Sequence, residues 1–471
     1  MTQPLEMRLF NTLTGRVDPL VPLHPGEIGM YVCGVTVYNR GHIGNFRTFV
    51  ATDLLRRALR YAGYRVTEVM NVTDVDDRII QQAQAAGKGL AEFTAEYIRA
   101  FEEDARCLGL EPPEKNPRAT EHIPEMIDLI SRLQARGHTY TVDGSVYFRI
   151  AAFPEYGRLS HLDVEGIKAG ARVDTDKYDK ENARDFVLWK MKSDEPAWAQ
   201  WDAPFGRGRP GWHLECSAMS MKYLGETFDL HCGGIDLIFP HHENEIAQSQ
   251  CATGQTFVRH WSHVAHLLIE NETMSKSKGN VFVIPDLLAK GHQPDAIRYA
   301  LIAAHYRSQL NFTWDGLGQA AAALARVRSF LQRASEIETA GPVSPAVETA
   351  VTKALAAFDA ALGEDLNTPE ALSAVHVLVG EANALLAAGE VTREGAARLR
   401  GAIEKMDSVL GVLLPQGEDR LSAEEQALFD ERQEARRRRD FARADEARAR
   451  LEALGIILED SAKGTRWRRK R

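Results

Sequence analysis

Hydrophobic residues in the first part of the chain follow the spacing of a strand, a helix and a second strand. Residues 28–33 form a short apolar run that predicts a buried strand, and the glycines of 34–44 indicate a turn after it. The spacing in 46–64 predicts a helix, and residues 65–72 predict the next strand. This order is typical of a βαβ unit, so we expect a parallel sheet of the nucleotide-binding kind.

Further helix and strand patterns follow up to about residue 270. A stretch without clear periodicity, 165–204, interrupts them, and we interpret it as part of an insertion between two halves of the sheet. The elements predicted on either side are helices at 76–86, 90–108 and 121–135, a hairpin of 139–142 with 145–150 around Asp143-Gly144, and strands at 228–231 and 260–268.

The chain beyond about residue 285 is mostly helical in pattern. Alanine and leucine recur there at helical spacing, which predicts a bundle, and a small charged domain follows it. The predicted elements are helices at 320–331, 345–361, 369–386 and 421–454, and a terminal hairpin of 456–459 with 465–468. The fold class is therefore α/β: a Rossmann-type parallel-sheet catalytic domain with an insertion, then an α-helical bundle and a small C-terminal α+β domain.

Composition narrows the class of protein. The chain is 44% hydrophobic and 26% charged, as in soluble globular proteins, and it has no basic start with an apolar core behind it and no long apolar run. We therefore expect neither a signal peptide nor a membrane span. Five scattered cysteines do not suggest a disulfide framework, so a reducing, cytoplasmic compartment is expected.

Charge is unevenly distributed. The net charge of −9 argues against a nonspecific nucleic-acid binder. The end of the chain, however, is basic at 436–439 and 466–471, and such a tail can bind a polyanion at one defined place. A solvated helix face with a frayed terminus is the alternative interpretation.

Four residues of types that suit a metal are spread over the catalytic half. Cys33 ends the first predicted strand, and Cys216 lies far downstream. If Pro240 starts a helix, His241 and Glu245 lie one turn apart on one face, about 5–6 Å from each other. Two thiolates, an imidazole and a carboxylate suit tetrahedral Zn²⁺.

Other interpretations of the same region stay open. Either cysteine alone could be a small buried hydrophobic residue. The pair His241-His242 could be an ordinary polar helix start. Cys232 is a rival ligand that spacing does not exclude, whereas Cys107 and Cys251 are expected to be structural.

A second set of residues suits a nucleotide. His42 and Gly44 fall where the first strand passes into the first helix, and there a glycine lets a phosphate approach the helix N-terminus. His42 and Asn45 can donate hydrogen bonds to phosphate oxygens. Lys276 lies in a loop of 274–280 and is suited to stabilise a phosphoryl transition state.

These nucleotide patterns are weak one by one. The chain has no Walker A sequence, and a loop of Ser, Lys, Gly and Asn is more often a plain surface loop. Gly234 follows a strand, and Asp236 could hold a ribose hydroxyl, although a tight turn explains this pair equally well. The order of the two motifs across a large α/β domain is what indicates a nucleotide site.

With these residues in place, the chain resembles the cysteinyl-tRNA synthetases, a family of class I aminoacyl-tRNA synthetases. The likeness extends nearly from end to end, and the motifs are highly specific in combination. They lie at 31–38, 71–77, 209–213, 239–245, 305–308 and 464–469.

The resemblance implies one zinc ion per chain, held by Cys33, Cys216, His241 and Glu245, that takes the substrate thiolate as a further ligand. Chemistry supports this, because cysteine and serine differ by one atom and an ordinary pocket separates them poorly. A preference for soft ligands separates a thiolate from a hydroxyl, so no editing domain is required.

The resemblance also implies the remaining site residues. The amino-acid pocket would be lined by Gly34, Thr73, Trp212 and His231. ATP with Mg²⁺ would be bound by Thr36, His42, Gly44, Asn45, Gly234, Asp236, Met274, Ser275, Lys276 and Ser277. His42, Asn45 and Lys276 would be the catalytic residues.

Two positions depart from the family pattern. The first signature usually reads His-Ile-Gly-His, and Asn45 replaces its last histidine. The second usually reads Lys-Met-Ser-Lys-Ser, and Thr273 replaces its first lysine. Asparagine still donates a hydrogen bond but carries no charge. Because Lys276 is retained, we expect activity with weaker ATP binding.

The implied reaction is activation of L-cysteine by ATP and transfer of cysteine to tRNA(Cys), by a chain expected to be monomeric. Arg466, Trp467 and Arg468 would contact the tRNA, with bases stacking on the tryptophan. Two alternatives stay open: a cysteine ligase acting on an amino sugar, as in mycothiol synthesis, and an inactive RNA-binding paralogue.

The domain boundaries expected from this interpretation follow the predicted elements. They are 1–137 and 205–270 for the two halves of the catalytic domain, 138–204 for the inserted domain, 271–340 for the signature-loop region that contacts the tRNA stem, 341–415 for the anticodon-binding bundle and 420–471 for the basic C-terminal domain.

Overall fold

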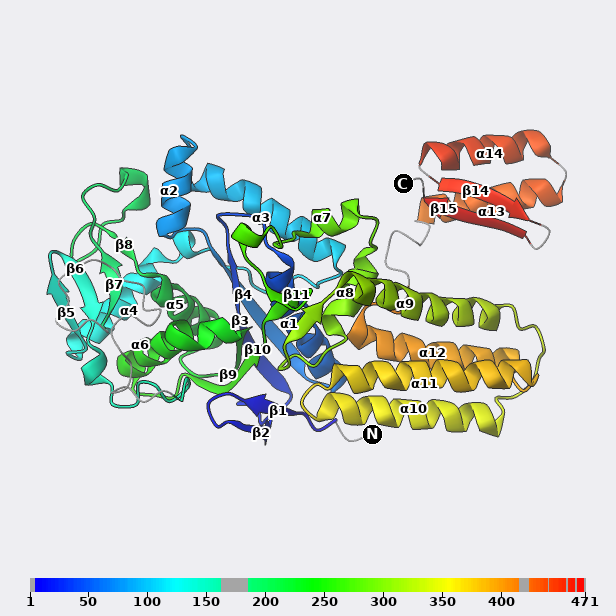
Figure 1. The fold of residues 1–471 in the computed structure, drawn as a ribbon, viewed down its shortest axis with the longest axis horizontal. Helices are drawn as coiled ribbons and strands as arrows, with labels where there is room; N and C mark the ends of the chain where they lie inside the picture. Colours follow the sequence, from blue (N-terminus) through cyan, green and yellow to red (C-terminus); the bar gives the residue numbers. More distant parts are fainter. Residues whose placement is uncertain are drawn as a thin grey trace. The chain divides into compact units, whose positions relative to one another are not determined.

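The computed structural model describes residues 5–161, 185–414, 423–438, 440–454, 456–461 and 464–469 (Figure 1). The chain divides into two units, Met1–Leu410 and Gly411–Arg471. The first unit contains the parallel sheet, an antiparallel sheet and a helical bundle, and the second is a small α+β unit. Together these elements confirm the predicted fold class.

A four-stranded parallel sheet forms the centre of the first unit. Its strands lie in the order β10 (Val258–Val264), β9 (Phe228–Gly234), β3 (Glu27–Thr36) and β4 (Arg65–Thr73). All residues of β9 are buried, as expected for a strand covered on both faces. The strands predicted at 28–33, 65–72 and 228–231 are confirmed, each somewhat longer than its apolar run.

Helix α1 (Ile43–Tyr61) connects β3 to β4 and completes the predicted βαβ unit. Its inner face buries Phe49, Leu54, Leu55 and Leu59, whose spacing carried the prediction. The other long helices up to β10 are α2 (Asp77–Ala85), α3 (Leu90–Cys107), α4 (Ile123–Ala135), α5 (Trp212–Leu224) and α6 (Glu243–Thr253). The first three confirm the helices predicted over this region.

An antiparallel sheet of four strands lies between the two halves of the parallel sheet in the sequence. Its strands are β5 (Thr139–Val142), β6 (Ser145–Phe148), β7 (Phe186–Lys190) and β8 (Arg209–Pro210). The predicted hairpin is confirmed, and Asp143 and Gly144 have the positive φ angles that a two-residue turn requires. The strand β7 was missed because all five of its residues are buried and show no alternation.

The strand predicted over 260–268 is two strands in different sheets, so that prediction is wrong. Strand β10 pairs with β9, whereas β11 (Leu267–Ile269) pairs with β12 (Glu272–Thr273) and β13 (Leu310–Phe312). Between them, the amide of Ala265 donates to the carbonyl oxygen of Tyr306. A continuous apolar run does not reveal where its backbone hydrogen bonds change partners.

Four long helices form the bundle at the end of the first unit. They are α9 (Trp314–Ser335), α10 (Pro345–Gly363), α11 (Thr368–Ala387) and α12 (Arg393–Leu410), preceded by the shorter α7 (Ile284–Ala289) and α8 (Pro294–Ile302). The long helices lie side by side (Figure 1). The bundle is confirmed, and α12 is a member that the sequence pattern did not reveal. Of the described helices only α11 has the length and mean hydropathy, 1.2, of a possible membrane span, a test that a core helix also passes.

A buried arginine joins the bundle to helices α1 and α3. The guanidinium of Arg298 is fully buried and donates to the carboxylate of Asp53 at 2.5 Å and to the carbonyl oxygens of Leu108 and Leu410, each at 3.1 Å. These contacts hold α1, the end of α3 and the end of α12 together. A buried ion pair of this kind is costly to break, because removal of one partner leaves an uncompensated charge.

The second unit has a small core of its own. Helices α13 (Ala423–Arg437) and α14 (Phe441–Ala453) pack with the hairpin of β14 (Ile456–Ser461) and β15 (Gly464–Arg469). The hairpin is confirmed, but the single helix predicted over 421–454 is wrong, because Asp440 caps a second helix through the amide of Arg443. Trp467 packs against the core residues Leu428, Leu451, Ile456 and Leu458.

Candidate active site and metal centre

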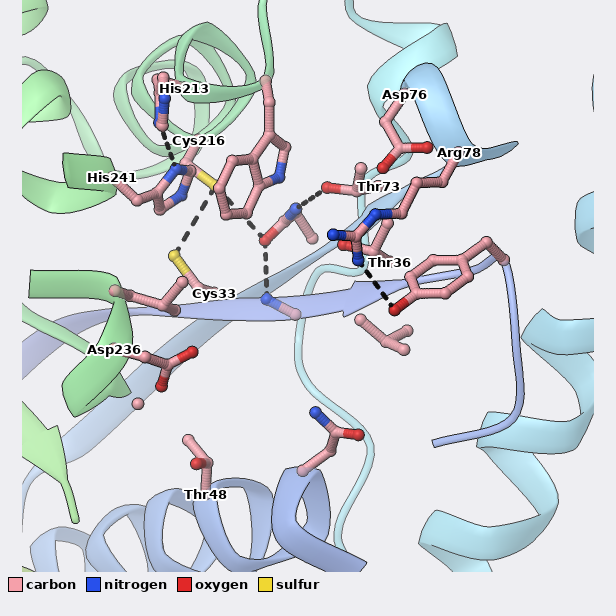
Figure 2. A pocket seen from close by; sticks show the side chains of 18 of the residues that line it. Cys33, Thr36, Thr48, Thr73, Asp76, Arg78, His213, Cys216, Asp236 and His241 are labelled. Carbon is pink, nitrogen blue, oxygen red and sulfur yellow. Dashed lines mark hydrogen bonds between the residues drawn. The ribbon is translucent and has the colours of Figure 1, made fainter. Parts of the chain in front are cut away.

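A cavity of about 710 Å³ opens at the carboxyl ends of the parallel strands, where ligands bind in open α/β sheets. Its wall is contributed by the ends of β3, β4 and β9, the start of α1, and residues of α5 and α6. Most of the residues singled out in the sequence lie on this wall: Cys33, Gly34, Thr36, His42, Gly44, Asn45, Thr73, Trp212, Cys216, Gly234, Asp236, His241 and Met274. Segments far apart in the sequence therefore meet in one site (Figure 2).

One end of the cavity gathers the residues of metal-binding type. The Sγ atoms of Cys33 and Cys216 are 3.7 Å apart, and Cys33 Sγ lies 3.9 Å from Glu245 Oε1. His241 Nε2 lies 3.1 Å from the same carboxylate oxygen. The four residues predicted as ligands are thus brought together from β3, α5, the turn that leads into α6 and the first turn of α6. Figure 2 shows three of them, Cys33, Cys216 and His241, close together.

His242 is a fifth donor that the sequence did not single out as a ligand. Donor atoms of Cys33, His241, His242 and Glu245 all lie within 4.8 Å of one another. His242 Nε2 is 3.3 Å from Cys33 Sγ, whereas Cys216 Sγ lies 3.7 Å from Asn71 Oδ1. The group therefore offers two ligand sets, one with Cys216 and one with His242.

Hydrogen bonds fix the imidazole rings at this end. His241 Nδ1 pairs with His213 Nδ1 at 2.9 Å, which leaves its Nε2 toward Glu245, and the Trp212 ring stacks on it with centroids 4.2 Å apart. His242 Nδ1 pairs with His263 Nε2 at 2.8 Å. A neutral imidazole has one donor and one acceptor, so the direction of this last bond decides whether His242 Nε2 donates to Cys33 or is free to bind a metal.

Burial sets the protonation of these groups. Burial, with the neighbouring Cys216, raises the pKa of the Cys33 thiol, and burial raises the pKa of the Glu245 carboxyl. Burial also lowers the pKa of His241. A thiol, a carboxyl and neutral imidazoles, gathered without a cationic side chain among them, are a donor set that fits Zn²⁺, whose charge would favour the thiolate and carboxylate forms.

The rival ligand Cys232 lies apart from this group. Its side chain is buried against a separate small void that Ser262 and Tyr306 also line. Among the described residues, it is therefore not one of the clustered donors.

The wall next to the metal-type residues holds those expected to bind the amino acid. Thr73 Oγ1 donates to Glu215 Oε2 at 2.8 Å and accepts from Asn71 Nδ2 at 3.2 Å. Gly34 must be glycine, because a Cβ there would lie 1.7 Å from the carbonyl oxygen of Asn71. His231 does not line the cavity; it lies behind the wall, with Nε2 3.0 Å from Glu245 Oε2.

The start of α1 forms the nucleotide side of the cavity. His42 is its N-cap, and its Nδ1 accepts from the amide of Asn45 at 3.2 Å, while the amide of His42 donates to Asn45 Oδ1 at 3.0 Å. Asn45, the departure from the usual signature, is thus built into a reciprocal capping arrangement. The helix N-terminus that it caps favours an anionic ligand.

The loop that carries the second signature is tied to the first. A Cβ at Gly44 would lie 2.3 Å from Met274 Cε, and the amide of Ile43 donates to the carbonyl oxygen of Phe282 at 2.8 Å. The two motifs predicted to share one nucleotide site therefore touch. Asp236, which is exposed, lines the cavity next to Gly234 and on the side of α1, near Thr48 (Figure 2).

Within that loop, hydrogen bonds fix the serines. Ser275 Oγ and Ser277 Oγ are 2.6 Å apart, and the amide of Ser275 donates to Asn280 Oδ1 at 2.8 Å. Neither serine is among the residues lining the cavity. Lys276 begins a single turn of 3₁₀ helix, and its side chain lies outside the described part of the chain.

Two groups on the cavity wall were not singled out in the sequence. Lys190 and Arg209 both pair with Asp77. Burial acts to raise the pKa of that carboxyl, but Arg209, Lys190 and Lys192 together lower it overall. The second group is Arg78, which Figure 2 shows at the far side of the cavity from Cys33, Cys216 and His241, together with Tyr38, to which Arg78 donates a hydrogen bond. Tyr38, Asp77, Arg78 and Arg209 lie in or beside the motifs at 31–38, 71–77 and 209–213, which was the signal available, whereas Lys190 lies in none of them.

Comparison with known proteins identifies the family to which this fold belongs. The sequence profile described as tRNA synthetases class I (C) catalytic domain matches residues 19–322, a DALR domain matches 357–414, and a cysteinyl-tRNA ligase anticodon binding domain matches 418–468. Fold and profile together define a class I aminoacyl-tRNA synthetase. Relatives named cysteine–tRNA ligase from Koribacter versatilis (strain Ellin345) and Solibacter usitatus (strain Ellin6076) are 47% and 48% identical, over 99% of this chain and 100% of each relative. The chain belongs to the cysteine–tRNA ligase family.

Solved structures show the same fold at low sequence identity. A Mycobacterium tuberculosis methionyl-tRNA synthetase in complex with methionyl-adenylate aligns with a TM-score of 0.59 and 18% identity, over 82% of this chain and 90% of the other. An Agrobacterium radiobacter LeuRS–tRNA–LeuAMS complex aligns with a TM-score of 0.60 and 12% identity, over 84% and 85%. These likenesses concern the fold alone.

Proposed function

We propose that the chain is a cysteine–tRNA ligase that activates L-cysteine with ATP and transfers it to tRNA(Cys). The observation that carries the proposal is the single cavity in which two thiols, an imidazole and a carboxylate adjoin a capped helix N-terminus. Full-length relatives with that name support it. Cysteine, ATP and tRNA are thus the expected substrates.

Selection of cysteine is assigned to the metal-type residues. Cys33, Cys216, His241 and Glu245 would hold the zinc ion, and zinc bound there would accept a substrate thiolate in preference to a hydroxyl. His213 and Trp212 position the His241 ring through a hydrogen bond and a stacking contact. The close packing of Gly34 on Asn71 keeps β3 and β4 at the spacing that this pocket needs.

Activation is assigned to the start of α1 and the second signature loop. A carboxylate oxygen of cysteine attacks the α-phosphorus of ATP·Mg²⁺ and forms a new O–P bond. Pyrophosphate leaves with the electron pair of the broken phosphoanhydride bond. The carboxylate is already ionised, so no general base is needed. His42, Asn45 and Lys276 stabilise the charge on the phosphates, with Met274, Ser275 and Ser277 shaping the loop, and Asp236 holds the ribose.

ATP binding also uses the small residues at the strand ends. Thr36, Gly44 and Gly234 line the cavity without bulky side chains over the helix N-terminus. At Gly234 a Cβ would lie 2.5 Å from Asp236 Oδ1, so a larger residue there would displace the carboxylate proposed to meet the ribose. On the amino-acid side, Thr73 lines the pocket and His231 supports it from behind through Glu245.

Transfer requires tRNA to reach the same cavity. The 2′-hydroxyl of the terminal adenosine attacks the adenylate carbonyl, an ester forms and AMP leaves. The bundle and the basic second unit would bind the tRNA. Trp467 is half-buried against the core of that unit, so only its exposed part is available for a base; the side chains of Arg466 and Arg468 lie outside the described residues.

Two alternative functions, an amino-sugar ligase and an inactive RNA-binding paralogue, are less well supported. A ligase that passes cysteine to an amino sugar does not need the second unit, whose residues match an anticodon-binding domain. An inactive paralogue is disfavoured because Asn45 keeps the helix capped and the two signature motifs remain in contact. We further propose that the chain acts as a monomer in the cytoplasm, without contact with membranes.

The test is aminoacylation of bulk tRNA by the zinc-loaded full chain with labelled cysteine. We expect an ester that is labile in base and that forms only on tRNA with an intact terminal ribose, so periodate-treated tRNA is the control. Cysteine-dependent ATP–pyrophosphate exchange without any charging of tRNA would favour the amino-sugar ligase. Absence of both activities would favour the inactive paralogue.

A further inference from the structure

One side of the cavity carries residues to which the proposed function assigns no role. The metal-type residues occupy one end, and the start of α1 with Asp236 occupies another. The remaining wall carries Tyr38, just beyond β3, and Arg78, in the first turn of α2. Figure 2 shows Arg78 beside Thr36 and Asp76, away from Asp236.

Tyr38 and Arg78 form a pair of an aromatic ring and a cationic guanidinium on that wall. Arg78 Nη1 donates to the Tyr38 hydroxyl oxygen at 3.2 Å, and the guanidinium carbon lies 5.5 Å from the centre of the Tyr38 ring. Tyr38 is half-buried and Arg78 is exposed, so the pair is accessible from the cavity. An aromatic ring next to a guanidinium plane is the chemistry that proteins use to stack an unpaired base.

Two other charged groups near the pair have partners of their own. Arg40, which lines the same part of the cavity, is paired in bidentate fashion with Asp104, at 2.8 and 2.7 Å. Asp76 is engaged as the N-cap of α2, accepting from the amide of Ile79 at 2.6 Å. Arg40 is therefore committed to α3 and Asp76 caps the backbone of α2, although the Asp76 carboxylate also interacts electrostatically with Arg78, which lines the cavity.

We propose that Tyr38 and Arg78 are the platform on which the terminal adenine of the tRNA stacks during transfer. The inference rests on the proposed function, because it assigns a subsite to the second of its two steps. A nucleotide whose base rests on this pair keeps its ribose inside the cavity that also holds the adenylate. The pair is thus a positioning element for the attacking 2′-hydroxyl, and takes no part in activation.

The variants that test this are Tyr38→Ala, Tyr38→Phe, Arg78→Ala and, as a matched exposed arginine on α3 outside the cavity wall, Arg99→Ala. In the zinc-loaded full chain, transfer from preformed enzyme-bound adenylate is measured in a single turnover, and ATP–pyrophosphate exchange is measured separately. We expect Tyr38→Ala and Arg78→Ala to slow transfer about 10-fold to 100-fold, the range that corresponds to one base stack. Exchange should stay within about twofold, and Tyr38→Phe and Arg99→Ala should resemble the parent chain.

A tRNA with an abasic terminal nucleotide that keeps its 2′-hydroxyl makes the test specific. With the parent chain it should lose as much transfer rate as Tyr38→Ala loses with intact tRNA, and the two changes together should cost little more than either alone. Additive losses would overturn the proposal, and so would a fall in exchange equal to the fall in transfer. If the parent chain itself shows no exchange, the proposed function fails, and that outcome is separate from these.

Discussion

Cys33 and Cys216 lie 183 positions apart in the sequence, yet their Sγ atoms are 3.7 Å apart in the fold. Cys33 belongs to β3 and Cys216 to α5, and each is buried. The pair therefore depends on the packing of one helix against one strand. The pair lies beside Glu245, so both cysteines can bind one metal ion with Glu245 only if α5 packs on β3 in this way. Identifying the ligands of the metal therefore tests the fold directly.

We expect Cys216, and not His242, to complete the zinc site. His242 Nε2 is 3.3 Å from Cys33 Sγ and its Nδ1 is held by His263, which suits a ring that donates a hydrogen bond to the thiolate. His242→Asn should weaken zinc binding about 10-fold to 100-fold while one zinc per chain is retained at saturation. Cys216→Ser should weaken it further.

Cobalt substitution separates the two ligand sets. In the parent chain and in His242→Asn, the thiolate-to-cobalt charge-transfer band should have the intensity of two thiolates, and in Cys216→Ser that of one. Retention of the full band in Cys216→Ser, with loss of metal in His242→Asn, would assign the ligand role to His242.

Asn45 is expected to act both as a cap and as a phosphate contact. Asn45→Asp keeps the oxygen that accepts from the amide of His42 but brings a negative charge toward the phosphates. It should preserve thermal stability and reduce the rate of ATP–pyrophosphate exchange by about 10²-fold or more. Asn45→Ala should lower the exchange rate and also the free energy of unfolding, by about 1 kcal/mol. An Asn45→Asp chain that exchanges normally would remove Asn45 from the phosphate site.

Glu68 is expected to make stability depend on pH. Burial raises the pKa of its carboxyl to about 8, although Arg56 lies 3.3 Å away, because Asp53 and Glu114 oppose that cation's effect. The folded chain therefore binds this proton more tightly than the unfolded chain between the ordinary value of 4.5 and about 8. The free energy of unfolding falls as pH rises through that window, by at most about 1.4 kcal/mol per pH unit, and levels off above it.

The matching variant is Glu68→Gln, which cannot ionise. Its stability relative to the parent chain should increase as the pH is raised from 6 to 8, measured by denaturant unfolding. Glu96→Gln, an exposed change on α3, should follow the parent at both pH values. A Glu68→Gln chain whose stability difference is constant with pH would show that Glu68 is ionised in the fold.

Removal of 420–471 is expected to separate the two steps of the reaction. The second unit has its own core, so its loss should leave the cavity of the first unit intact. The kcat/KM for tRNA should fall at least tenfold, about 1.4 kcal/mol, while exchange with cysteine changes little. Equal losses of charging and exchange would contradict a tRNA-binding role for this unit.

The sequence predicted the parallel sheet well because its elements carry strong local signals. The residues of β3, α1 and β4 have the apolar run, the glycine turn and the helical spacing of a βαβ unit. One prediction failed and one strand was missed where the information is not local. The run at 260–268 changes sheets at Ala265, and β7 is buried on both sides with no alternation.

The site was predictable as a set of residue types but not as a geometry. Cys33, Cys216, His241 and Glu245 converge as expected, yet spacing did not show that His242 reaches the same point or that His231 lies behind Glu245. Contacts between distant segments decide both. The sequence also did not show that Trp467, which was expected to stack on a base, packs against the small core of the second unit. In the hairpin Trp467 pairs with Leu458.

The most direct test of the account is ATP–pyrophosphate exchange with cysteine and with serine on one sample whose zinc content is measured, then repeated after chelation and after zinc is restored. If zinc selects the substrate thiolate, we expect about one zinc per chain and exchange with cysteine alone. That exchange should be lost on chelation and should return when zinc is restored. Equal exchange with cysteine and serine, or exchange with cysteine that survives complete removal of the metal, would contradict selection of the substrate thiolate by zinc.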